Sequence, residues 1–304
     1  MLKIRIRLLL ACLSTLFLLA ACGGASDETP TPPAPIAAAW FYLSDNHDYR
    51  NIPAEWQQIT FDKVDVLYVG PGGIQEHNDF GLFDSAQTGP LRHRFEWLVD
   101  QARRYNPDIK IVISQWWGNG QDVWGKPLSA LQGEDALNAY VQSVADFISY
   151  YQTYEGGRYA LDGFDIDYED NNVTADFPAL AHKLKDALQV LSSQYGKPLR
   201  LTLSPAAGEY LNPDSLAPFD YINMQSYAGG MDIPPEAFLQ ESVPASKILY
   251  GICPETNCDT YDEEDVLAKY RQYGLAGVHL WRLNSDNHVY EGQVQQRIYS
   301  ALHP

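Results

Sequence analysis

The chain has 304 residues, of which 45% are apolar, enough for one large domain with a buried core. Its formal net charge of −18 at pH 7 argues against nucleic acid and anionic lipid surfaces as partners. A neutral polysaccharide is compatible with that charge.

The first 21 residues have the form of a secretory signal. Basic residues precede an apolar run over residues 8–21, and this run is short for a membrane span. Its end, Leu-Ala-Ala-Cys-Gly at residues 19–23, resembles a bacterial lipobox, which implies cleavage before Cys22 and lipidation of that thiol. Since no Asp follows Cys22 directly, we expect a lipid anchor at the outer membrane or cell surface of a bacterium. An ordinary signal peptide with an incidental cysteine is the alternative.

Residues 22–38 are small, polar and rich in proline, a composition typical of a disordered tether. No internal repeat or low-complexity break follows. Residues 39–304 are therefore predicted to form a single domain, and we expect it to be monomeric.

Within this domain, short apolar runs alternate with longer amphipathic ones. The last of the clear helices has Thr260 and Glu263 in capping-box spacing and Gly274 at its end. Only short or irregular helices are predicted after the first, fifth and sixth strands. The clearest helices are predicted over residues 91–105, 134–151, 176–195 and 262–273.

Eight strands separated by helices are typical of a (β/α)8 barrel, the TIM barrel of the α/β class. Active sites in this fold lie at the carboxyl ends of the strands. The strands are predicted over residues 38–43, 64–69, 109–114, 161–168, 199–204, 221–225, 247–252 and 277–283.

The fourth of these strands brings three acids onto one face. Because side chains alternate along a strand, Asp165, Asp167 and Glu169 point one way, while Phe164 and Ile166 point the other. Neighbouring acids lie about 6.6 Å apart, where two charges repel by ~2.5 kcal/mol at an effective dielectric constant of about 20. This repulsion should hold a proton on the group near neutral pH, as a general acid requires.

A solvated acidic edge and a divalent metal site are the alternatives for these acids. The apolar opposite face argues against an exposed edge. A metal site should show further His or Asp ligands near other strand ends, and the chain offers no clear set. We therefore expect no metal and no cofactor.

The same residues resemble a family signature. Asp-Gly-Phe-Asp-Ile-Asp-Tyr-Glu at residues 162–169 fills every fixed position of the D-G-x-D-x-D-x-E motif of glycoside hydrolase family 18, the chitinases and endo-β-N-acetylglucosaminidases. The resemblance implies a retaining mechanism in which the 2-acetamido oxygen of the substrate attacks the anomeric carbon. It makes Glu169 the general acid and then the base, with Asp167 orienting the acetamide and Asp165 sharing a proton with Asp167. Asp162 is out of phase with these three and is assigned to structure.

Polar residues also mark the sixth and eighth strand ends. Asn223, Gln225 and Tyr227 share one face, which is costly at a barrel mouth unless they meet a ligand or each other. By resemblance, Tyr227 would bond the N-acetyl group, Gln225 would line the same pocket, and Trp281 would form the floor of the sugar site. Asn223, on the same face as Gln225, is a further candidate for substrate binding. A polar plug and plain core packing are the alternatives, and His279 is expected to be a satisfied core residue.

The chain departs from the family at the third and seventh strands. Trp116 and Trp117 stand where the family usually has a small Ser-x-Gly-Gly turn; they would either widen the contacts with sugar or close part of the groove. The loop over residues 253–261 leaves no room for the α+β domain that many bacterial chitinases insert there, so an open groove and internal cleavage are expected. An exported compartment favours a disulfide between Cys253 and Cys258 in this loop over a zinc site.

Three functions are compatible with these patterns. The first is an endo-acting chitinase that hydrolyses β-1,4 linkages of N-acetylglucosamine. The second is an endo-β-N-acetylglucosaminidase that cuts the chitobiose core of N-glycans with the same motif. The third is a non-catalytic sugar-binding lipoprotein, which the presence of Glu169 argues against.

Overall fold

The computed structural model describes residues 34–44, 51–82, 91–116, 125–227, 234–255, 258 and 263–304, apart from the side chain of residue 171. The predicted signal, the lipidation site Cys22 and most of the predicted tether lie outside these residues, as does Trp117. Within the described residues, none of the helices is long and apolar enough to cross a membrane.

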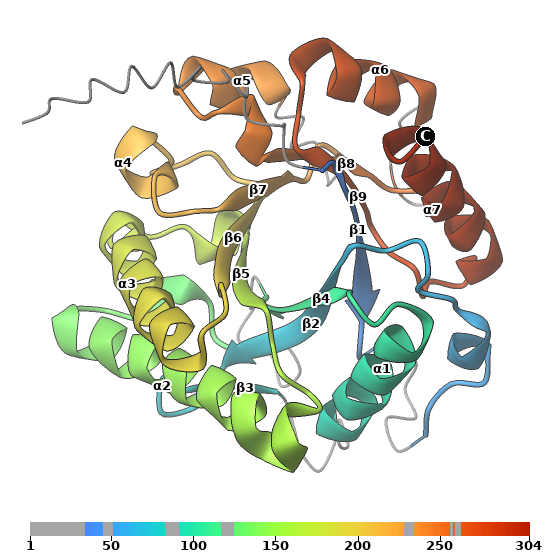
Figure 1. The fold of residues 1–304 in the computed structure, drawn as a ribbon. Coiled ribbons are helices and arrows are strands. Elements are labelled where there is room, and N and C mark those ends of the chain that lie inside the picture. Colours follow the sequence, from blue (N-terminus) through green and yellow to red (C-terminus); the bar gives the residue numbers. More distant parts are fainter. Residues whose placement is uncertain are drawn as a thin grey trace, which may run out of the picture. The chain divides into compact units, whose positions relative to one another are not determined.

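The domain is a closed parallel barrel surrounded by helices (Figure 1). Each barrel strand pairs in parallel with the next, and β1 pairs with both β9 and β2 to close the ring. The predicted (β/α)8 barrel is therefore confirmed. Its strands are β1 (Ile36–Tyr42), β2 (Val66–Ile74), β4 (Lys110–Gln115), β5 (Gly163–Tyr168), β6 (Arg200–Pro205), β7 (Tyr221–Met224), β8 (Ile248–Ile252) and β9 (Gly277–Leu280).

One strand was not predicted. β3 (Phe80–Leu82) pairs antiparallel with the end of β2, which runs beyond the predicted limit at residue 69 as far as Ile74. The extension passes through Gly70-Pro71-Gly72-Gly73, a composition that favours a turn. Gly72 is required there, because a Cβ on it would lie 2.4 Å from the Phe80 ring.

The helices agree well with the sequence pattern. The four clear predictions correspond to α1 (Leu91–Tyr105), α2 (Glu134–Thr153), α3 (Phe177–Tyr195) and α6 (Glu263–Tyr273). As predicted, the helices after the fifth and sixth barrel strands are short: α4 (Pro213–Leu216) and α5 (Pro235–Gln240). A further helix, α7 (His288–Leu302), packs beside α6 and β1.

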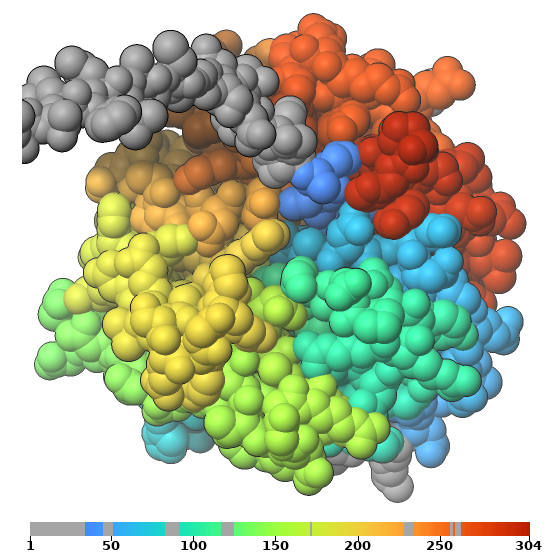
Figure 2. Space-filling model, viewed as in Figure 1, coloured from blue at the N-terminus to red at the C-terminus, as the bar shows by residue number. Residues whose placement is uncertain are grey.

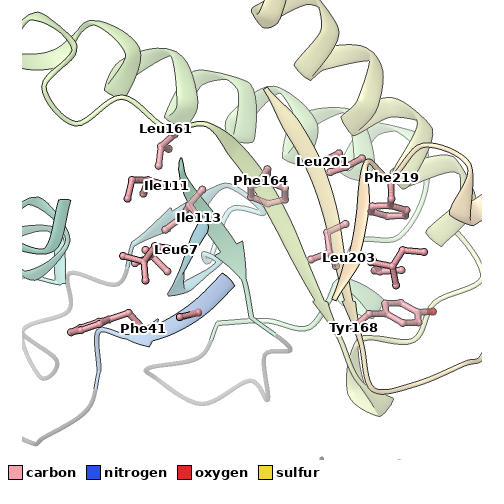
Figure 3. Close-up of a cluster of buried hydrophobic side chains, with 14 of the residues drawn as sticks. Phe41, Leu67, Ile111, Ile113, Leu161, Phe164, Tyr168, Leu201, Leu203 and Phe219 are labelled. Carbon is pink, nitrogen blue, oxygen red and sulfur yellow. The ribbon is translucent and has the colours of Figure 1, made fainter. Parts of the chain in front are cut away.

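Alternation along the strands builds two apolar layers. In β1, Ala37, Ala39 and Phe41 belong to the large outer cluster between strands and helices, while Ala38 and Trp40 belong to a smaller cluster inside the barrel. Figure 3 shows part of the outer cluster, to which β4, β5 and β6 contribute as well as β1. In the space-filling view, atoms fill the centre of the ring (Figure 2). The polar residues described next lie on the inward face, toward the carboxyl ends of the strands.

Candidate active site

Asp165 lies at the centre of a buried polar cluster. It is fully buried in β5 and accepts hydrogen bonds from hydroxyl groups on both neighbouring strands. Ser114 of β4 donates at 2.8 Å, and Thr202 and Ser204 of β6 donate at 2.6 and 3.0 Å. Asn223 of β7 donates through Nδ2 at 3.3 Å. These donors hold the carboxylate in one orientation.

Burial and hydrogen bonding act on Asp165 in opposite directions. Loss of solvation raises its pKa from 3.8 to about 6, although the bonds from Thr202, Ser114, Ser204 and Asn223 favour the anion and lower it. The direction agrees with the expectation from sequence, but the cause differs. Burial, rather than repulsion from the other two acids, dominates.

Asp167 lies one step closer to the barrel mouth and is 5% exposed. Its Oδ1 accepts a hydrogen bond of 2.7 Å from Gln225 Nε2, which also donates to the Ser204 carbonyl at 2.9 Å. Gln225 therefore fixes the position of the Asp167 carboxylate, and its polar group is satisfied by the site itself.

Glu169 follows the last residue of β5 and is only partly buried. Its pKa is raised from 4.5 to about 7, first by burial and second by the charge of Asp170. A carboxyl group with this pKa is protonated in a large fraction of molecules at neutral pH. As with Asp165, the causes differ from the repulsion between motif acids that the sequence predicted.

Tyr227 reaches the same cluster from the end of β7. Its ring is 6% exposed, and its hydroxyl has no hydrogen-bond partner among the described residues. Burial, followed by the charges of Asp167 and Glu169, raises its pKa. The hydroxyl is therefore neutral, lies near both acids and has an unused capacity for a hydrogen bond.

An aromatic group lies at the ends of β1, β4 and β9. Trp281 is partly exposed, and its ring centroid lies 5.7 Å from that of Trp116 and 5.6 Å from that of Trp40. Trp116, predicted either to widen the contacts with sugar or to close part of the groove, is 3% exposed and stacks on Tyr42 at 4.6 Å, which fits the second alternative better. Trp281 and Tyr42 are the members of this group that are partly exposed.

Asn223 and His279 both lie in the barrel interior, where the first differs from its predicted role and the second agrees with it. Asn223, predicted as a substrate contact, is fully buried and serves Asp165 and Ser204 instead. His279 is a satisfied core residue: Trp40 Nε1 donates to its Nδ1 at 3.2 Å, and its Nε2 donates to the Met224 carbonyl at 3.0 Å. Burial lowers the pKa of His279 to about 4, so it is neutral.

Asp162 lies away from the acid cluster, at the start of β5. It accepts from the Ile111 amide at 3.0 Å and pairs with Lys197 at 3.4 Å. This residue holds neighbouring strands together, in agreement with its assignment to structure.

The loop after β8 is closed by a disulfide between Cys253 and Cys258, whose Cα atoms are 5.9 Å apart. Glu255 of this loop pairs with Arg282, which lies over the Tyr42 ring. In the described part of the chain, these two cysteines and Glu255 form the one cluster with metal-ligand chemistry. Since both thiols are in the disulfide, the cluster offers a metal no thiolate.

A hollow of about 630 Å³ lies at the opposite end of the barrel, lined by the end of α3 and the starts of β6 and β7. It contains none of the acids of the cluster. The acid cluster lies instead toward the carboxyl ends of the strands.

Sequence reasoning missed several residues of this region. Thr202 and Ser204 alternate on β6 as the acids do on β5, a pattern that could have indicated donors for Asp165. Tyr42 and Asn172 carry no such signal. Tyr42 stacks on Trp116, and the buried side chain of Asn172 bonds Leu128 and Trp116, so both depend on contacts between segments distant in sequence.

The comparisons with known proteins agree with this arrangement. The family described as Glycosyl hydrolases family 18 matches residues 38–233. Among curated proteins, none matches the chain significantly. Solved structures, however, align over most of its length.

Three of these structures are chitinases. The class V chitinase of Nicotiana tobaccum has a TM-score of 0.65 and 13% identity, covering 87% of this chain and 99% of its own. A family 18 chitinase of Flavobacterium johnsoniae has a TM-score of 0.65 and 17% identity, covering 90% and 94%. One from Cycas revoluta, in complex with (GlcNAc)3, has a TM-score of 0.64 and 17% identity, covering 88% and 99%. Likeness at this level of identity shows the fold.

Proposed function

The chain belongs to glycoside hydrolase family 18, and we propose that it is an endo-acting, retaining hydrolase of β-1,4-linked N-acetylglucosamine, as in chitin or its oligosaccharides. The observation that carries this proposal is the row of acids at the carboxyl end of β5. Asp165 is fully buried, Asp167 is 5% exposed, and Glu169, the residue after the strand, is partly buried. The similar structure from Cycas revoluta binds (GlcNAc)3, which supports the class of substrate.

Glu169 suits the role of general acid and base. Its raised pKa keeps a proton available for the leaving oxygen near neutral pH. As the bond between the anomeric carbon and that oxygen breaks, the proton of Glu169 moves to the leaving sugar. The resulting carboxylate then takes a proton from the water that attacks the anomeric carbon.

The nucleophile in this proposal is the acetamido oxygen of the substrate, which forms an oxazolinium ion. Asp167, held by Gln225 at 2.7 Å, is suited to accept the acetamide N–H and to stabilise the positive charge that develops there. The unpartnered hydroxyl of Tyr227 is suited to donate to the acetamide oxygen. Asp165 supports Asp167 from below, and the partly open ring of Trp281 can stack on a pyranose face.

The short loop between β8 and α6 supports internal cleavage. Residues 253–262 separate Ile252 from Glu263, too few for an inserted domain that would wall the groove. A polymer could therefore enter from the side rather than by its end.

Cleavage of the chitobiose core of N-glycans is the second candidate. It requires the same acids, and the aromatic end of β4, where Trp116 stacks on Tyr42, differs from the small turn usual in the family. A non-catalytic sugar-binding protein is the third candidate, but it would have no need of a carboxyl group with a pKa near 7.

We also propose that the mature chain is lipidated at Cys22 and anchored at the outer membrane or cell surface. The lipobox-like sequence and the proline-rich stretch after it support this location. Mass spectrometry of the protein from the membrane fraction would test it: an acylated Cys22 is expected, and an unmodified N-terminus at another residue would refute it.

The proposed activity is tested by the masses of the products from two substrates, a chitin hexasaccharide and a high-mannose glycopeptide. Short N-acetylglucosamine oligomers are expected from the first. A peptide left with a single N-acetylglucosamine would identify the glycan-core enzyme instead. Binding without cleavage of either substrate would favour the sugar-binding protein.

The assignment of Glu169 is tested with Glu169→Gln. This variant should lose about 10²–10⁴-fold in kcat, the usual contribution of a general acid, while retaining oligosaccharide affinity measured by calorimetry. Asp176→Asn, which alters an exposed acid seven positions along the chain, is the matched control and should keep wild-type turnover. Near-normal turnover by Glu169→Gln would refute the assignment.

A further inference from the structure

The turn that carries Glu169 lies beyond the pairing between β4 and β5. That pairing ends where Gln115 lies opposite Ile166. The next residues of β5, including Asp167, therefore have no strand partner on the β4 side. The carbonyl of Asp167 accepts a hydrogen bond instead from a side chain, Asn172 Nδ2, at 2.6 Å.

Asn172 is fully buried and lies three residues after Glu169. Its backbone N–H donates to the Glu169 carbonyl at 2.8 Å, while its side chain bonds the Asp167 carbonyl. One residue therefore holds the backbone on both sides of Tyr168, at the two positions from which the Asp167 and Glu169 side chains extend.

The same amide group links this turn to its surroundings. Asn172 Oδ1 accepts from the Leu128 amide at 2.8 Å, and Nδ2 also lies 3.4 Å from the Trp116 carbonyl. That carbonyl accepts a 2.6 Å bond from Gln115 Nε2, and the Tyr140 hydroxyl of α2 donates to Gln115 Oε1 at 3.0 Å. The network joins the ends of β4 and β5 to the helix between them.

We propose that Asn172 is a positioning residue that fixes the direction of the Glu169 carboxyl group toward the leaving oxygen. The backbone of Glu169 is extended, and the 3-10 turn Asp170–Asn172 follows at once, so the carboxyl direction depends on how that turn is held. Without the Asn172 side chain, the Asp167 carbonyl and the Leu128 amide both lose a buried partner. The proposal rests on the proposed function, because it assigns Glu169 the role of general acid.

The test compares two substrates in wild type and Asn172→Ala. A chitin oligosaccharide has a poor leaving group and needs protonation by Glu169, whereas a dinitrophenyl chitobioside has a good one and does not. Because a misplaced acid costs rate only where a proton is needed, kcat/KM should fall by about 10–100-fold for the oligosaccharide and by less than about threefold for the dinitrophenyl substrate.

Asn106→Ala is the matched control. Asn106 also donates through Nδ2 to a backbone carbonyl, that of Val64, at 2.8 Å, and it accepts from the Asp108 amide at 3.1 Å. It precedes β4, at the end of the barrel away from the acids, so its loss should weaken folding without changing the ratio between the two substrates. Equal losses on both substrates in Asn172→Ala would overturn the proposal.

A second variant and a second readout keep the test decisive. Asn172→Asp preserves shape and the bond from Leu128 but loses the donor to Asp167, so it should show the same selective loss even if Asn172→Ala fails to fold. The Glu169 carboxyl can also be titrated by ¹³C NMR without substrate. A changed Glu169 titration in Asn172→Ala, which adds no charge, supports positioning. This result would stand even if the wild-type protein cleaved neither substrate, an outcome that would refute only the proposed function. An unchanged titration together with equal losses refutes the positioning role.

Discussion

Glu169 owes its proton near neutral pH to burial first and to the charge of Asp170 second. The two causes can be separated, because Asp170 is exposed and can be changed without opening the site. A general acid must be protonated to act, so activity should fall as pH rises through its pKa of about 7. The basic limb of the pH profile therefore reports on this one side chain.

Asp170→Asn removes a negative charge next to Glu169, which makes ionisation of Glu169 easier and lowers its pKa. The basic limb of kcat/KM should move to lower pH by about half a unit to one unit, with activity at acidic pH preserved. Asp176→Asn leaves the charge beside Glu169 in place and should not move the limb. A limb that stays in place, or moves to higher pH, in Asp170→Asn would contradict the assigned cause.

At the scale of the elements, the packing of β8 against Tyr227 depends on a glycine, Gly251. A Cβ on Gly251 would lie 2.3 Å from the Met224 carbonyl and 2.6 Å from the Tyr227 ring. Both neighbours belong to β7 or the residues just after it. The close approach of β7 to β8 at Gly251 is therefore needed to place Tyr227 in the site.

Gly251→Ala should destabilise the fold by about 1–3 kcal/mol through overpacking and should lower turnover by displacing Tyr227. Gly292→Ala is the matched control. Gly292 is exposed inside α7 with open space around its Cα, so alanine there should stabilise by about 0.5–1 kcal/mol. Urea denaturation measures both changes, and effects of the same sign in the two variants would contradict this explanation.

The elements also show where prediction from sequence succeeds. The barrel could be predicted because its strands are continuous apolar runs, and the acids because alternation within one strand decides their face. β3 could not be predicted, because the sequence Gly70-Pro71-Gly72-Gly73 favours a turn, and only the packing of Gly72 against Phe80 shows that β2 continues through it. Asn172 could not be predicted, because its contacts with Leu128 and Trp116 join segments far apart in sequence. The same holds for the stacking of Tyr42 on Trp116. The raised pKa values were predicted in direction but not in cause, since burial is a property of the folded chain.

At the scale of the whole molecule, two buried groups make stability depend on pH in opposite directions. Burial raises the pKa of Asp165 to about 6, so the folded state binds its proton more tightly than the unfolded state. This contribution is fully present below the unfolded pKa near 4 and is lost as pH rises through about 6. Burial lowers the pKa of His279 to about 4, so its contribution is present above the unfolded pKa near 6.5 and is lost as pH falls. The two largely cancel between pH 4 and 6.5.

Asp165→Asn removes one side of this balance. The difference in unfolding free energy, variant minus wild type, should increase by about 3 kcal/mol between pH 4 and pH 7, because only the wild type loses the Asp165 contribution as pH rises. The variant should therefore unfold more readily than wild type on acidification from pH 6.5 to pH 4, where neutral His279 must take up a proton. Urea denaturation across this range measures the difference. A value that is constant with pH would show that Asp165 titrates alike in the folded and unfolded chains, and that its four donors offset its burial.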